Sequence, residues 1–86
     1  MYKQSLTIPN PTGIHARPAS DLVALAKQFQ SDIRIDNGQK LLNAKSILSI
    51  LSGGLKQNVE ISVIAEGSDE EQAGASIVEL ISGFTE

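Results

Sequence analysis

The sequence has no cysteine among its 86 residues. A disulfide framework and a thiolate metal site are therefore excluded, and the fold has to rest on its apolar core. The chain also has a single histidine, His15, and no His-x-x-x-His pair. One imidazole supplies too few ligands for a zinc centre. The sequence accordingly predicts no metal site and calls for no resident cofactor.

Basic residues and long apolar runs are also scarce. The sequence has seven Lys and Arg residues and ten Asp and Glu residues, which gives a net charge of −3. This balance argues against nucleic acid as a partner, because nucleic-acid binders carry a basic surface. No stretch approaches the roughly 20 apolar residues of a membrane span, and Lys3, Gln4 and Ser5 interrupt any signal-peptide-like run. We expect a soluble, monomeric, cytoplasmic protein.

The length and uniformity of the chain indicate one domain, residues 1–86. There is no internal repeat, low-complexity tract or linker, and the size suits one modest core. A domain this small is poorly suited to enclosing a deep, dry catalytic cleft, because it buries a smaller share of its surface. We therefore expect any chemistry to take place on the surface of the protein.

Hydrophobic periodicity predicts the secondary structure. Alternating residues indicate strands at 2–8, 32–36, 40–44 and 58–66. The pair Asn37-Gly38 is typical of a hairpin between the second and third strands. A helical stripe predicts a first helix over 16–29, formed by Ala19, Leu22, Val23, Ala26 and Phe29.

Two further helices follow from capping signals. Ser46 is a good N-cap for a short helix over 47–52. Ser68 and Glu71 form a capping box for a last helix, in which Gly74 indicates close packing. The apolar side of that helix consists of Ala73, Ile77, Leu80, Ile81 and Phe84. The order β-α-β-β-α-β-α predicts a two-layer α+β sandwich, with a four-stranded, mostly antiparallel sheet and all helices on one face.

The segment NPTGIHARPAS, residues 10–20, holds the candidate site. Pro18 fits the first turn of a helix, where a backbone N–H has no intrahelical partner. If the helix begins at Ala16, His15 is the N-cap. Histidine is a poor N-cap, so stability does not explain its position. A lone histidine is most often structural or merely exposed, and that reading stays open at this point.

The chemistry of the helix end favours a functional reading. A neutral imidazole at this position has a nitrogen lone pair that can act as a nucleophile. The free N–H groups there attract anions. Arg17 could form charge-assisted hydrogen bonds to a phosphoryl group, although a solvated surface arginine is the ordinary alternative. A Ser-His-Asp triad is improbable, because Ser20 and Asp21 belong to the same helix as the histidine.

The segment TGIHARPAS resembles the active-site motif of the HPr family of phosphocarriers. NAKSIL and AEGSDEEQA also match that family, so the resemblance covers nearly the whole chain. It implies an open-faced β-sandwich in which His15 accepts a phosphoryl group on Nδ1 from enzyme I. It also implies transfer of that group to the IIA domains of sugar permeases, with Arg17 stabilising it and Ala16 and Pro18 forming the adjoining helix N-terminus. Such a carrier is a substrate of enzymes and not an independent catalyst.

Ser46 has a structural and a regulatory interpretation. The structural one is the helix N-cap. The resemblance implies the other, because HPr proteins of many low-GC Gram-positive bacteria are phosphorylated at this serine by HPr kinase/phosphorylase. They then bind catabolite control protein A. Enteric relatives carry the same serine without such a kinase, so the residue alone does not establish regulation.

The apolar residues after Ser46 also admit two readings. Ile47, Leu48 and Leu51 follow on a helix too short to bury every side chain, so part of the set should form a docking patch for partners. The alternative is that all three face the core. Many Gram-positive relatives have methionines where this chain has Leu48 and Leu51. Several relatives place the Asn-Gly turn one residue later relative to the serine. These departures bear on partner range and hairpin register, not on the His15 chemistry.

Two other functions stay open at the level of sequence. One is an HPr paralogue in a regulatory or nitrogen-type phosphorelay, with the same chemistry and different partners. The other is a small α+β interaction module whose histidine is incidental.

Overall fold

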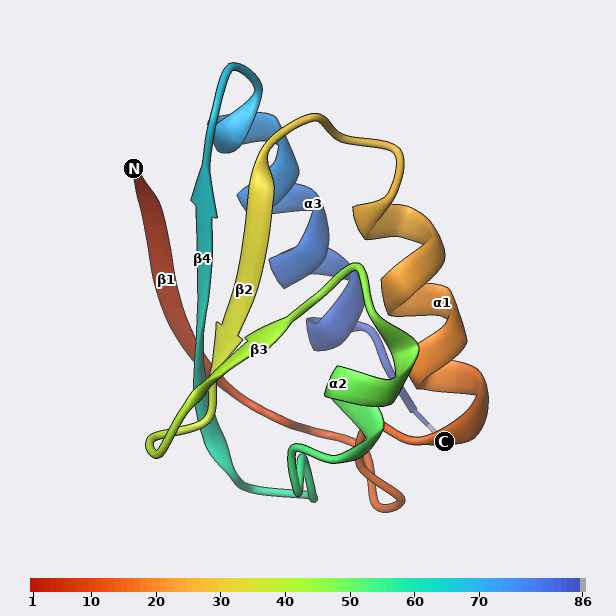
Figure 1. Cartoon of the computed structure of the whole chain (residues 1–86). Coiled ribbons are helices and arrows are strands. Elements are labelled where there is room, and N and C mark those ends of the chain that lie inside the picture. Colours follow the sequence, from red (N-terminus) through yellow and green to blue (C-terminus); the bar gives the residue numbers. More distant parts are fainter. Residues whose placement is uncertain (86) are drawn as a thin grey trace.

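The computed structural model describes residues 1–85 and has the predicted element order. The strands are β1 (Tyr2–Thr7), β2 (Asp32–Asp36), β3 (Leu41–Asn43) and β4 (Glu60–Glu66). The helices are α1 (Ala16–Ala26), α2 (Ile47–Leu51) and α3 (Glu70–Ser82). The sheet order is β1-β4-β2-β3, with every neighbouring pair antiparallel. The helices lie against one face of the sheet and leave the other face open (Figure 1), which confirms the predicted open-faced β-sandwich.

The core lies between the sheet and the helices, because the apolar side of the sheet and the apolar stripes of the helices face each other. Alternate residues of β2 and β4 are buried, while their neighbours face the open side. The helical stripes supply the other half, and the buried residues of α1 and α3 include Leu22, Val23, Ile77 and Ile81. The predicted close packing at Gly74 is confirmed, because a methyl group there would overlap the ring of Tyr2.

The first helix is shorter than the periodicity predicts. It ends at Ala26 rather than at Phe29. The last turn tightens, since the backbone N–H of Phe29 bonds to the carbonyl of Ala26, three residues back. Phe29 still packs against the core, and its carbonyl accepts a hydrogen bond of 2.8 Å from Lys45 Nζ. The apolar stripe therefore predicted correctly that Phe29 packs against the core, but it predicted too long a helix.

The start of α3 corrects a second prediction. The N-cap is Asp69, not Ser68, and it makes no side-chain cap hydrogen bond. Its carboxylate instead accepts hydrogen bonds from the backbone N–H groups of Gln30 and Ser31, at 3.0 and 2.9 Å, and from the Ser31 hydroxyl. The predicted capping box is therefore wrong, because Asp69 binds the α1–β2 turn across the molecule.

These hydrogen bonds make part of the free energy of unfolding dependent on pH. The hydrogen bonds from the Ser31 hydroxyl and from the Gln30 N–H lower the pKa of the Asp69 carboxyl below its ordinary value of 3.8. The stabilising contribution is complete above that ordinary value and is lost as the pH falls through the lower folded-state value. We expect Asp69→Asn to lower the urea midpoint at pH 7 and to have a smaller effect near pH 3.

The matched control is Glu71→Gln, an exposed carboxylate in the first turn of the same helix. Its effect on the urea midpoint should be small at both pH values. An Asp69→Asn variant with the same deficit at pH 7 and at pH 3 would show that the carboxylate charge does not contribute.

The β2–β3 hairpin forms where Asn37-Gly38 predicts it. Gly38 has a φ of +94°, a left-handed conformation that favours glycine. The side chain of Asn37 accepts hydrogen bonds from the backbone N–H groups of Gln39 and Lys40, both at 2.9 Å. The strands on either side begin and end within one residue of the predicted limits.

Candidate functional site

The loop between β1 and α1 is held in place from both sides. Asn10 Nδ2 donates to the Gly13 carbonyl at 2.7 Å. The backbone N–H of Ile14 donates to the Leu55 carbonyl at 2.8 Å, and the Ile14 side chain is buried. Gly13 itself has a φ of +72°. These contacts fix the backbone immediately before His15, so the loop presents that residue in a defined position.

His15 is the N-cap of α1, as predicted from Pro18. Its backbone is extended, with φ −141° and ψ 169°, and its side chain makes no cap hydrogen bond. Pro18 is buried in the first turn, whereas His15 and Arg17 are both exposed. The imidazole therefore stands at the N-terminus of an eleven-residue helix, where it is accessible to a partner.

Ala16 has a feature that sequence patterns do not signal. Its φ of +45° lies in the left-handed region, which costs a residue with a Cβ roughly 1–2 kcal/mol. Such strain persists only where the surrounding structure enforces it, and it concentrates at functional sites. Here it lies directly beside the histidine. A shallow depression next to it is lined by Thr12, His15, Ala16, Arg17 and Pro18.

Ser46 begins α2, which confirms the structural part of its prediction. Its hydroxyl accepts a hydrogen bond of 3.3 Å from the backbone N–H of Ser49. The side chain is half-buried. The neighbouring Lys45 reaches across to the carbonyl of Phe29, beyond the end of α1. No sequence signal pointed to this contact, which ties the start of α2 to the end of α1.

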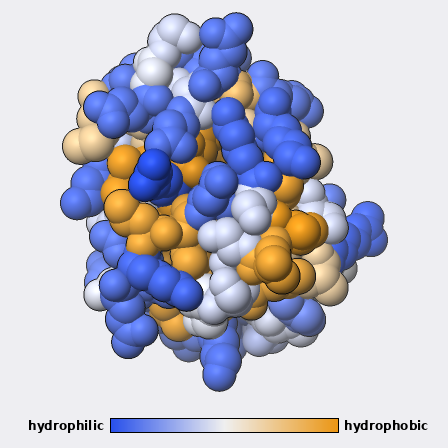
Figure 2. Space-filling view, in the orientation of Figure 1, coloured by the Kyte–Doolittle hydropathy of each residue, from blue (hydrophilic) through white to orange (hydrophobic). Residues whose placement is uncertain are grey.

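The apolar residues of α2 are exposed rather than buried. Ile47, Leu48 and Leu51 are 42%, 75% and 47% exposed, whereas Ile50 is completely buried. Ile50 alone therefore anchors the helix to the core, and the reading in which the other three face the core is wrong. Figure 2 shows apolar surface over α2. We call Ile47, Leu48 and Leu51 the α2 patch; it belongs to a helix that packs against α1.

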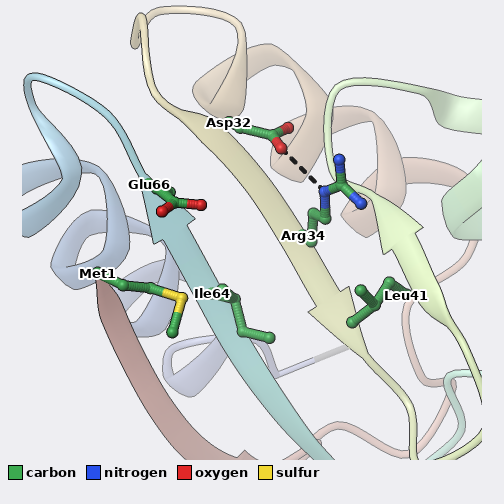
Figure 3. Close-up of a pocket in the computed structure, with 6 residues that line it drawn as sticks. All are labelled: Met1, Asp32, Arg34, Leu41, Ile64 and Glu66. Atoms are coloured by element: carbon green, nitrogen blue, oxygen red, sulfur yellow. Dashed lines mark hydrogen bonds and ion pairs between the residues drawn. The ribbon is translucent and has the colours of Figure 1, made fainter.

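A second hollow lies on the open face of the sheet, away from His15. It is lined by Met1, Asp32, Arg34, Leu41, Ile64 and Glu66 (Figure 3). The Arg34 guanidinium is paired with the Asp32 carboxylate at 2.9 Å. None of the predicted site residues lies in this hollow.

Residues 1–85 contain no group of three or more His, Cys, Asp and Glu side chains placed to hold a metal ion. Within the same range, no helix combines the length and the apolar character needed to cross a membrane.

Comparison with known proteins identifies the family. The family model described as "PTS HPr component phosphorylation site" matches residues 2–83. The phosphocarrier protein HPr of Lysinibacillus sphaericus is 43% identical over 81 residues, covering 94% of this chain and 92% of that protein. The crystal structure of HPr-C-His from Thermoanaerobacter tengcongensis superposes with a TM-score of 0.91 at 43% identity, covering 95% of this chain and 92% of that one.

A relative with a different assembly is also similar. The Bacillus subtilis catabolite repression protein Crh, described as an intertwined dimer with a swapped domain, has a TM-score of 0.77 at 33% identity. The match covers 95% of this chain and 94% of Crh. The family model and the close relatives agree over nearly the whole sequence. The chain therefore belongs to the HPr family, the phosphocarrier proteins of the phosphotransferase system.

Proposed function

We propose that His15 is the residue that carries the phosphoryl group, accepting it from enzyme I and passing it to IIA domains of sugar permeases. One observation carries this proposal: the only imidazole of the chain is exposed at the N-terminus of α1, in the depression that it shares with Arg17. A surface site suits a carrier, because donor and acceptor proteins have to reach the same atom in turn.

The chemistry requires no other nucleophile. The lone pair of His15 Nδ1 attacks the phosphorus of phosphorylated enzyme I, and the bond from phosphorus to the donor atom of enzyme I breaks as the new P–N bond forms. Attack by a IIA nucleophile on the same phosphorus then returns the lone pair to His15. In this proposal the N–H groups at the start of α1 and the Arg17 guanidinium stabilise the negative charge of the phosphoryl oxygens.

The assay is phosphorylation by purified components. The protein is incubated with phosphoenolpyruvate and the sugar-system enzyme I, and we expect an acid-labile, base-stable phosphoryl group that a IIA domain removes. In parallel, the nitrogen-type enzyme I replaces the sugar-system enzyme. Faster labelling by the nitrogen-type enzyme would favour the paralogue in a regulatory relay, and no labelling by either would overturn the carrier proposal.

Replacement of Arg17 tests its part in the transfer. A hydrogen bond to a charged group contributes about 1.5–3 kcal/mol, so Arg17→Met should slow single-turnover phosphorylation of His15 roughly 10- to 150-fold. Arg17→Lys should retain part of the rate, since it keeps the charge and loses the planar donors. The matched control is Arg34→Met on the open sheet face. Equal rates for the two methionine variants would contradict the assignment.

We also propose that phosphorylation of Ser46 regulates docking at the α2 patch. The hydroxyl is half-buried and immediately precedes Ile47, so a phosphate there would place negative charge beside the three exposed apolar side chains. HPr kinase/phosphorylase with ATP should produce an acid-stable phosphoserine, and the phosphorylated protein should bind catabolite control protein A.

A charge variant tests this regulation without the kinase. Ser46→Asp should slow phosphorylation of His15 by enzyme I, because the carboxylate opposes docking and desolvation at the patch. Aspartate is also a good N-cap, so α2 should remain folded. Ser68→Asp is the control, since Ser68 is exposed in the turn before α3 and adjoins no residue of the α2 patch. Rates equal to wild type for Ser46→Asp would count against regulation through this surface.

A further inference from the structure

A groove runs between α1 and α3 on the helical side of the molecule. It has a volume of about 540 Å³ and shares no residue with the depression at His15. Its lining consists of Asp21, Leu25, Ser76, Glu79, Leu80, Gly83 and Phe84. The groove is therefore built by two helices and by the short segment that follows α3.

The floor of the groove is apolar and incompletely covered. Leu25, Leu80 and Phe84 each pack against the hydrophobic core on one side and remain half-buried. Single exposed apolar residues are ordinary on protein surfaces. Here three of them, from three segments of the chain, line one concave surface, which is typical of a surface that receives a partner side chain.

The charges of the groove are of one sign. Asp21 comes from α1 and Glu79 from α3, so each helix contributes one carboxylate to the lining. No lysine or arginine is among the lining residues. An apolar floor with a carboxylate from each wall complements a helix that carries an apolar stripe flanked by lysine or arginine. An acidic helix with the same stripe would meet like charges on both sides.

The groove is distinct from the α2 patch and lies near the phosphocarrier site. Asp21 is one helical turn beyond Arg17 on α1. The end of α3 lies beside the start of α1 in Figure 1. From this geometry we infer that the α1–α3 groove docks a basic amphipathic helix of a partner protein, separately from docking at the α2 patch. This inference does not rest on phosphoryl transfer.

The test uses a defined probe and the unphosphorylated full chain. The probe is an 18-residue synthetic helix of leucine and lysine, with leucine at i, i+3, i+4 and i+7; a second peptide has glutamate in place of lysine. ¹⁵N chemical-shift titration at low salt should move the amides of residues 20–26 and 76–84. The double variant Asp21→Asn/Glu79→Gln should weaken binding about tenfold, because both ion pairs with the lysine peptide are lost.

The control variant changes the net charge equally on the opposite side. Glu60→Gln/Glu66→Gln removes two exposed carboxylates from the open face of β4, and it should bind the lysine peptide like wild type. An equal loss of affinity for both double variants would show non-specific attraction and overturn the inference. So would equal binding of the glutamate peptide, shifts centred on the α2 patch, or the absence of binding.

Discussion

Replacement of His15 by alanine is expected to remove all acid-labile phosphoryl label in the assay with phosphoenolpyruvate and enzyme I. The reason is that the chain has no second imidazole to accept the phosphoryl group. Label is counted after base treatment, which leaves a phosphoramidate intact and removes phosphoserine. Label that persists in His15→Ala would show that another residue carries the group.

The variant also has to be folded for this result to count. The His15 side chain is exposed and makes no cap hydrogen bond, so its removal should change the free energy of unfolding by no more than about 0.5 kcal/mol. Urea unfolding measures this directly. Phosphorylation of Ser46 by the kinase gives a second control, because a folded His15→Ala should still accept the acid-stable phosphate.

Gly13→Ala is expected to cause the largest loss of stability for the smallest chemical change. At its φ of +72° a side chain is strained, and the added Cβ would overlap the Leu55 carbonyl and lie 2.9 Å from Lys56 Cα. The obstacle is backbone, which cannot rotate away as a side chain can. Left-handed strain of roughly 1–2 kcal/mol and overpacking of about 1–3 kcal/mol together predict a loss on the order of 3 kcal/mol.

Gly38→Ala separates these two contributions. Gly38 also has a positive φ, of +94°, but outside its two chain neighbours no residue has a heavy atom within 4 Å of the position that a Cβ would take. It should therefore lose about 1–2 kcal/mol from strain alone. Urea unfolding of the two variants measures the difference in stability. Equal losses of stability would mean that the backbone at residues 55 and 56 moves to make room for the added methyl group. Gly13→Ala should also slow phosphorylation of His15, since this contact positions the loop before α1.

The local patterns were sufficient for the architecture and for the placement of the site. Alternation predicted four strands, and the apolar stripes predicted the buried side of each helix, because burial on one side imposes the period of the element on the sequence. Pro18 located the start of α1, which put His15 at its N-cap. These signals lie within a few residues of one another, so they can be read without knowing what packs against them.

Contacts between distant segments were decided by the tertiary structure. Asp69, and not Ser68, is the N-cap of α3, and its carboxylate binds residues 38 and 39 positions away along the chain instead of the helix N–H groups. The sequence left open whether Ile47, Leu48 and Leu51 face a partner or the core, and the structure shows all three exposed while Ile50 is buried. The sequence by itself thus determined which elements form and where the only imidazole stands. Packing between elements decides which surfaces remain open and which polar groups are bound across the molecule. The local hydrophobic period carries no information about this packing.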